Sequence, residues 1–306
     1  MNRELKFDLN IETNALICPN PEEFYSKAYI TADVADNFRT LPGIQSATKL
    51  ANVLFTNTLT ASTCNFGATN EALDAIDINV TAVSALAEIC RFDIEQSFLS
   101  MQMVAGSNGS FEVASFMSYY WDEMSKEIES EIEQIRWRGE STGTTNTFLD
   151  LADGYEVQLN DNSDVVDVAA ATVTSSNVLA EMIKVVDALP AVLKAKREDL
   201  RFFVSPDIAL NFELAAAQGN TMAYITKSLG LSFLGIKVVV AQGMSDGKMV
   251  LTRKDNLIYA FDAEGDSKAL KAVNLEESVA EPKLRTRANI KVGFHLVNPA
   301  EIVYYS

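Results

Sequence analysis

One long amphipathic segment most constrains the fold of this chain of 306 residues. Between Phe116 and Arg138, apolar residues recur at spacings of four, four, four, four and three, which is the period of one helix face. A helix of this length spans about 35 Å, at roughly 1.5 Å per residue. Because the stripe is narrow and no heptad repeat is sustained, we expect a helix with one buried side and not a coiled coil. The stripe consists of Phe116, Tyr120, Met124, Ile128, Ile132 and Ile135.

The flanks of this segment are typical of helix ends. Ser110 or Ser115 is suited to cap the start, and Gly139 stands where a C′ glycine ends a helix. Arg136 and Arg138 fall in the last turn, where cations favour the helix dipole. The other faces are acidic, which is typical of a solvated surface, and they carry Glu127, Glu129, Glu131 and Glu133.

The segment from Lys283 to Leu296 predicts one long strand, because its side chains separate by odd and even position. The even face is apolar and offers the best packing surface for the long helix. Two interpretations of the odd, basic face stay open. It is a sheet face that meets solvent or the acidic helix, or it contacts a polyanion through non-specific phosphate contacts. The apolar face is Leu284, Thr286, Ala288, Ile290, Val292, Phe294 and Leu296, and the candidate basic face is Lys283, Arg285, Arg287 and Lys291, beside Asn289 and His295.

The N-terminal quarter of the chain is typical of an arm and a long loop. Residues 1–30 show weak periodicity around Pro19-Asn20-Pro21, which indicates an extended arm. Residues 31–80 are rich in Thr, Asn, Ala and Ser, and they predict a long, mildly polar hairpin that ends in a strand over Ile76–Val80. Neither part has a local core, so each needs another surface to lie against.

The rest of the chain predicts helices followed by a run of antiparallel strands. Ser205, Pro206 and Asp207 suit the N-cap, the N1 position and the first turn of a helix. This order lacks a repeated βαβ pattern and predicts an α+β fold. The expected elements are a helix over 86–99, a loop over 140–165, a helix from Thr174 or Ser175 to Leu189, a strand over Leu200–Val204, a helix to Gly219, and strands over Ile236–Val240, Met249–Thr252, Leu257–Phe261, Lys283–Leu296 and the C-terminal EIVYYS.

Composition narrows the class of protein. The net charge is −17, which argues against nucleic-acid binding through global charge but leaves a local basic face open. Cys18, Cys64 and Cys90 form no CxxC pair, so we expect buried free thiols in a reducing compartment. The N-terminus lacks the apolar core of a signal peptide, and no apolar run is long enough to span a membrane. We therefore expect a soluble protein made in a cytoplasm.

The sequence offers little reactive chemistry. His295 is the one histidine, which argues against a usual zinc site, and its position indicates a surface residue on a strand. The motifs GxSxG, GxGxxG and GxxxxGK[ST] do not occur. Leu159–Asp167 carries Asp161 and Asp164 but lacks the central glycine and terminal glutamate of an EF-hand. We expect no enzyme activity, no cofactor and no metal.

The combined pattern resembles the tailed-phage major capsid protein family with the Hong Kong 97-type fold. The similarity covers nearly the whole chain and rests on element order, since the family has no short diagnostic motif. LPGIQSATKLANVLF resembles the extended loop, and ASFMSYYWDEMSKEIESEIEQIRWRGE resembles the spine helix. LRFFVSPDIALNFELAAAQG resembles the axial domain, GIKVVVAQGMSDGKMVLTRKDNLIYAFD the return to the peripheral sheet, and IKVGFHLVNPAEIVYYS the closing strands.

The resemblance implies a structural subunit that self-assembles as pentamers and hexamers into an icosahedral shell around packaged double-stranded DNA. It implies a virion capsid assembled in a host cytoplasm, with separate scaffolding, portal and cement proteins as further partners. It also implies a division into an N-terminal arm (1–30), an extended loop (31–75), a peripheral domain with the spine helix and an antiparallel sheet (76–155 and 250–306), and an axial domain (156–249). The subunit interface would then include Phe38, Leu41, Ile44, Lys49 and Phe55.

Some members of the family crosslink their subunits through a loop lysine. Lys49 is the one lysine in the expected loop, but no partner is evident, so we predict no crosslink. Three alternatives stay open. An encapsulin-type nanocompartment shell shares the fold and would need an internal groove for a cargo peptide. An enzyme with an unfamiliar carboxylate site, or another virion or surface protein of α+β build, would fit the composition.

Overall fold

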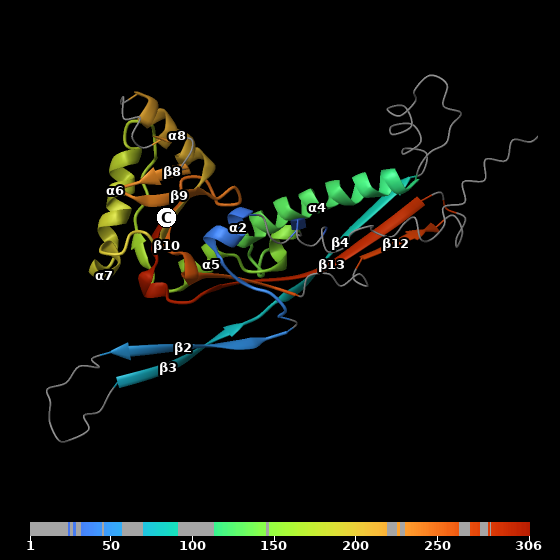
Figure 1. Cartoon of the computed structure of the whole chain (residues 1–306), viewed down its shortest axis with the longest axis horizontal. Helices are drawn as coiled ribbons and strands as arrows, with labels where there is room; N and C mark the ends of the chain where they lie inside the picture. Colours follow the sequence, from blue (N-terminus) through green and yellow to red (C-terminus); the bar gives the residue numbers. More distant parts are fainter. Residues whose placement is uncertain are drawn as a thin grey trace, which may run out of the picture. The chain divides into compact units, whose positions relative to one another are not determined.

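The computed structural model describes residues 24, 27–28, 32–44, 46–56, 70–90, 113–144, 147–218, 225–226, 230–262, 270–275, 281 and 283–306. The chain mixes helices with sheets and divides into two units (Figure 1). Unit 1 comprises Met1–Thr31, Ala82–Glu129 and Ala263–Ile290, and unit 2 comprises Ala32–Thr81, Ser130–Asp262 and Lys291–Ser306. Helix α4 (Val113–Arg138) and strand β13 (Lys283–Leu296) each contribute residues to both units.

The largest sheet lies in unit 2 and has seven strands in the order β5-β14-β10-β6-β9-β8-β7. Helices α6 and α8 lie beside it in Figure 1, and their apolar side chains form one buried cluster with the sheet. The elements are β5 (Val166–Val168), α6 (Val178–Ala188), α7 (Ala191–Lys194), β6 (Leu200–Val204), α8 (Pro206–Gln218), β7 (Ile225–Thr226), β8 (Gly230–Phe233), β9 (Ile236–Val240), β10 (Met249–Arg253) and β14 (Val303–Tyr305).

The start of α8 follows from its first residues. Pro206 occupies the first helical position, where it has no N–H to leave unpaired. The Asp207 carboxylate accepts hydrogen bonds from the Gly247 N–H at 3.2 and 3.1 Å, and it lies in the first turn, where the helix dipole favours an anion. These contacts tie the start of α8 to the turn before β10.

The strand pairing differs in part from the expected antiparallel run. Strand β6 pairs in parallel with β9 across a connection that contains α8, which is a βαβ arrangement. Strands β5 and β14 are also parallel, and so are β1 (Arg39–Leu41) and β11 (Leu257–Phe261). The nearly continuous apolar run of β6 is the signal of a parallel strand covered on both faces. Helices and sheets are both present, as expected, but the two larger sheets contain parallel as well as antiparallel strand pairs.

A second packing layer of unit 2 is aromatic. The rings of Phe38, Trp137, Tyr155 and Phe203 contact one another, with centroid distances from 5.1 to 6.2 Å. The buried guanidinium of Arg136 lies 5.1 Å from the Phe38 ring centroid and 4.8 Å from that of Tyr259, and it pairs with Glu133. This layer fixes the last turn of α4 against β11. Unit 2 also contains α2 (Ala32–Asn37), the 3-10 turns Phe148–Leu151, Lys254–Asn256 and Pro299–Glu301, and α5 (Tyr155–Asp161).

Two expectations about secondary structure are wrong. Residues 86–99 were expected to form a helix, but strand β4 (Thr81–Cys90) occupies the first part, and the remainder lies outside the described residues. The burial of β4 alternates with a period of two, because its less exposed residues Val83, Ala85, Ala87 and Ile89 share one face. The expected loop over 140–165 contains a 3-10 turn and the short helix α5, where Tyr155 supplies a fully buried ring.

The remaining elements agree with expectation within a few residues. Helix α6 begins after Asn177 and not after Thr174 or Ser175, and the strands over Ile236–Val240 and Lys283–Leu296 have the expected bounds. Most of the expected arm lies outside the described residues. Of its described residues, Phe24 packs edge-on against Trp121 at 5.5 Å, and Lys27 pairs with Asp122 at 2.7 Å. None of the described helices is long and apolar enough to span a membrane.

Candidate assembly surfaces

The first candidate surface is the long hairpin of unit 2, formed by β2 (Thr48–Thr56) and β3 (Asn70–Ile78). Figure 1 shows the two strands side by side, and they pair in antiparallel register from Thr48↔Ile78 to Thr56↔Asn70. In the described part of the chain these strands form a sheet of two strands only. A two-stranded sheet is marginally stable in water by itself, so the hairpin gains stability from whatever it contacts.

The hairpin is anchored at its base. Ile78 is fully buried against Ile258 and Ala260 of β11, and less buried apolar residues surround this cluster. These surrounding residues are Leu41, Ile44, Leu50, Ile76, Val80 and Val297. Leu41 and Ile44, expected at a subunit interface, therefore help to hold the base within their own chain. Lys49 is exposed and pairs with Asp77 of the opposite strand at 3.4 Å, and Phe55 lies in β2 opposite Glu71.

Phe38 requires a correction. The sequence placed it at a subunit interface, but it is 5% exposed and belongs to the aromatic layer of unit 2. Its ring stacks on Tyr155 with an interplanar angle of 7° and lies beneath the Arg136 guanidinium. The expectation failed because Phe38 directly follows α2, whose residues Val34 and Asn37 are also buried, so this stretch belongs to the interior of unit 2.

The second candidate surface is the stripe of α4. Ile128, Ile132 and Ile135 are buried, whereas Tyr120 and Met124 are half-buried, and nothing is described of the Phe116 side chain. The buried positions in the first half are instead Met117, Trp121 and Ser125. A strict spacing of four drifts by about 40° per step around a helix of 3.6 residues per turn, so the expected stripe leaves the buried side. The spacings between the observed buried residues are four or three and average to the helical period. These residues are Met117, Trp121, Ser125, Ile128, Ile132 and Ile135.

Within unit 1, α4 contacts the inner face of β13. The hydroxyls of Tyr120 and Thr286 share a hydrogen bond of 2.5 Å, and burial raises the pKa of the tyrosine. Leu284, Thr286, Ala288 and Ile290 are all buried on this face. In unit 2, Val292 and Phe294 continue the buried face, and Leu296 is half-buried.

The third candidate surface is the outer face of the unit 1 sheet, where β13 pairs with β4 and with β12 (Leu270–Asn274). Glu88 of β4 pairs with Lys283 at 2.7 Å and with Arg285 at 2.6 Å. Hydrogen bonds from Lys283 and then Arg285 hold the pKa of the Glu88 carboxyl below its ordinary value. The acid that pairs with Lys283 and Arg285 therefore comes from β4, which sequence reasoning missed because it expected residues 86–99 to be helical.

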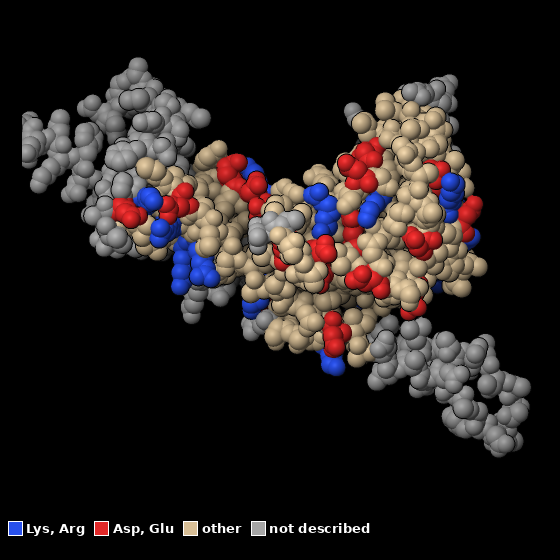
Figure 2. All heavy atoms as spheres, turned by 180° about the vertical axis from the view of Figure 1, so that it is seen from behind, with Lys and Arg blue, Asp and Glu red and all other residues tan. Residues whose placement is uncertain are grey.

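The other cations of this face are also engaged. Arg287 donates to the Asn289 side chain at 2.8 Å and to the Ser84 hydroxyl at 3.3 Å, and in unit 2 Lys291 pairs with Asp262 at 2.8 Å. Lys271 of β12 lies opposite Arg287 in the register. Figure 2 shows acidic and basic side chains interspersed over the visible face of the molecule, with no broad area of one sign. The basic face is local and partly neutralised.

Exposed apolar side chains mark surfaces that the sequence reasoning missed. Leu86 is 72% exposed on the outer face of β4, beside the cations, and Val273 is 49% exposed on β12. On α8, Leu210 and Leu214 are 59% and 43% exposed at a spacing of four. The sequence carried a signal for α8, because its apolar residues occupy more than the buried side of the helix, and an exposed apolar patch marks a contact surface. No cluster of three His, Cys, Asp or Glu among the described residues is placed to hold a metal.

Comparisons with known proteins agree with this architecture. No protein-family model matches the sequence, and no curated protein matches it. A chain of the satellite phage P4 procapsid, solved with the size determination (Sid) protein, aligns with a TM-score of 0.57 and 11% identity, over 92% of this chain and 96% of that chain. The capsid of the empty GTA particle aligns with a TM-score of 0.53 and 13% identity, over 90% and 89%.

The chain has the fold of tailed-phage capsid proteins. The resemblance inferred from the sequence is therefore confirmed for the fold. The same capsid fold also aligns with a virus-like particle from Pyrococcus furiosus, with a TM-score of 0.53 and 7% identity, over 96% of this chain and 97% of that chain. These alignments extend over nearly the full length of each chain, so the capsid fold describes both units and not a shared fragment.

Proposed function

We propose that this chain is a major capsid protein, a structural subunit that assembles with copies of itself into a closed shell. The observation that carries the proposal is the capsid fold over nine-tenths of the chain, shared with two phage-related shells. The hairpin supports it independently, since β2 and β3 form a sheet of two strands only in the described chain. Many symmetric contacts, each weak alone, would then sum to a stable particle.

The finer assignment follows the Hong Kong 97-type plan. Helix α4 would be the spine helix, α6 and α8 with strands β5, β6, β8 and β9 would form the axial domain within 156–249, and most of the hairpin would be the extended loop within 31–75. The peripheral domain would take 76–155 and 250–306, and residues 1–30 would form the arm. Pentamers and hexamers would enclose double-stranded DNA in a virion built in a host cytoplasm, with scaffolding, portal and cement proteins as separate partners. The role is structural, because the proteins that share this fold are shell components.

A second candidate is an encapsulin-type nanocompartment shell. The alignment with the Pyrococcus furiosus virus-like particle supports it, because that particle has the same fold at similar coverage. The two candidates differ in their contents, since one shell encloses DNA and the other encloses protein cargo.

The test is to express the full chain and examine it by size-exclusion chromatography and negative-stain electron microscopy. Rings, tubes or closed shells are the expected result. A compact monomer at high concentration, with the hairpin protected from protease, would contradict both candidates. Nuclease-protected DNA inside purified native particles supports the phage candidate, and co-purified protein cargo without DNA supports the nanocompartment.

A further inference from the structure

A single imidazole lies at the base of the hairpin. His295, near the end of β13, is the one histidine of the chain. Its Nε2 atom lies 3.0 Å from the Asn79 backbone N and 2.8 Å from the Asn79 carbonyl oxygen. Asn79 directly follows Ile78, the last residue of β3 and the centre of the buried cluster at the base. The ring therefore touches the chain where the hairpin leaves the body of unit 2.

The backbone also comes unusually close at this point. A Cβ atom added to Gly293 would lie 2.1 Å from the Asn79 carbonyl oxygen, so only glycine permits the approach. Gly293 and His295 are two residues apart and share one face of β13. The same face thus contacts Asn79 twice, once through the glycine backbone and once through the imidazole. The position of the base depends on both contacts.

One nitrogen atom cannot both accept from an N–H and donate to a carbonyl. When the ring is neutral with its proton on Nδ1, Nε2 accepts a hydrogen bond from the Asn79 N–H. When the ring is protonated, Nε2 carries a proton, donates to the Asn79 carbonyl, and leaves the Asn79 N–H without this acceptor. Protonation therefore exchanges one hydrogen bond for the other at the same backbone unit.

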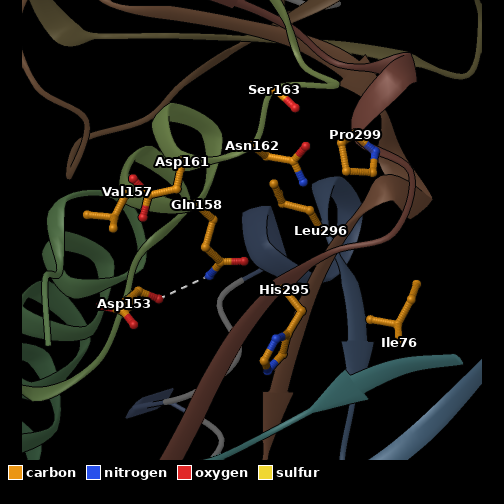
Figure 3. Close-up of a pocket in the computed structure, with 10 residues that line it drawn as sticks. All are labelled: Ile76, Asp153, Val157, Gln158, Asp161, Asn162, Ser163, His295, Leu296 and Pro299. Atoms are coloured by element: carbon orange, nitrogen blue, oxygen red, sulfur yellow. Dashed lines mark hydrogen bonds between the residues drawn. The ribbon is translucent and has the colours of Figure 1, made fainter.

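The surroundings determine how the ring titrates. His295 lines a cavity of ≈ 480 Å³, and Figure 3 shows it beside Ile76 on one side and facing Asp153 and Asp161 across the cavity on the other. The acidic groups around the ring are these two carboxylates and Asp77 of β3, which is paired with Lys49, and Ile258, opposite His295 on β11, carries no charge. Burial outweighs the other influences and lowers the pKa of His295 below 6.5.

We propose that His295 makes the attachment of the β2–β3 hairpin dependent on pH, holding its base through the Asn79 N–H when neutral and weakening that hold when protonated. The sign follows from the depressed pKa. The unfolded or detached base binds the proton more readily, so the stability of the attachment is full above pH 6.5 and is lost as the pH falls below that value. The proposal concerns the free chain and does not depend on shell formation.

The test uses the unassembled full chain. Because the chain has one histidine, its imidazole signals in a histidine-labelled NMR sample need no assignment, and ¹⁵N shifts report the tautomer directly. We expect the Nδ1–H tautomer above pH 6.5 and a midpoint below it. In parallel, hydrogen exchange measures protection factors for the peptides that contain Ile78 and Asn79 between about pH 8 and about pH 5.

In the wild type, protection at the hairpin base falls by roughly fivefold as the ring titrates, which is the change that one hydrogen bond of ordinary strength supports. His295→Gln supplies a neutral acceptor that does not titrate, so its protection stays level over the same range. An Nε2–H tautomer above pH 6.5, level protection in the wild type while the ring titrates, or an unchanged pH dependence in His295→Gln would each overturn the proposal.

Discussion

The placement of Phe38 inside unit 2 makes a quantitative prediction that separates an interior residue from an interface residue. The ring is 5% exposed and contacts three aromatic rings and the Arg136 guanidinium. Truncation of a buried phenylalanine to alanine costs about 3–5 kcal/mol, through lost transfer free energy and the cavity left behind. For a unit of this size, each kcal/mol lowers the unfolding temperature by about 2–4 °C. Phe38→Ala should therefore melt roughly 6–20 °C below the wild type.

The assay is thermal unfolding of the unassembled chain, followed by near-ultraviolet circular dichroism, which reports the packed aromatic layer. Phe38→Leu retains most of the apolar volume and should cost less than about 1.5 kcal/mol. Leu210→Ala is the surface control, because Leu210 is 59% exposed and its truncation should change stability by less than about 0.5 kcal/mol. If Phe38→Ala melts within about 2 °C of the wild type and fails only in assembly, the ring belongs to an interface and the interior placement is wrong.

Three further predictions test other parts of the account. Replacing Asn52–Asp74 by an Asn-Gly turn keeps the paired base of the hairpin. The shortened chain should fold with an unchanged melting temperature, but electron microscopy should show no assembly. Loss of the fold would show that the hairpin belongs to the core. Gly139→Ala should destabilise the chain in a denaturant titration, because its Cβ would lie 2.2 Å from the Ala152 carbonyl oxygen; equal stability would refute that close packing. Glu88→Gln releases Lys283 and Arg285 from their shared carboxylate and should delay elution from a heparin column. The control Glu123→Gln, on α4, should not delay elution. Equal delays for the two variants would reject the local basic face.

The sequence predicted well wherever one periodic pattern dominated. Lys283–Leu296 alternates so regularly that its bounds and its inner face followed from period two alone, and Pro206 with Asp207 located the start of α8. The buried side of α4 was predicted in the half with Ile128, Ile132 and Ile135. In its first half, Trp121 and not Tyr120 occupies the interior, and composition could not separate two aromatic neighbours.

Contacts between distant segments account for what the sequence could not supply. Strand β4 is a strand because β13 pairs with it, and its own residues also suit a helix. Phe38 is interior because Trp137, Tyr155 and Phe203 converge on it from three other parts of the chain. The carboxylate that neutralises Lys283 and Arg285 comes from Glu88, almost two hundred positions away, and no local pattern reports such a partner.

We propose that this chain builds a shell in which the β2–β3 hairpin contacts a neighbouring subunit. The most direct test is a cryo-electron microscopy map of the particles formed by the full chain. We predict a closed shell of repeated subunits in which each hairpin extends from its base at Ile78 and lies on an adjacent copy. A chain that stays monomeric, or a shell in which every hairpin folds back on its own unit 2, would contradict the account.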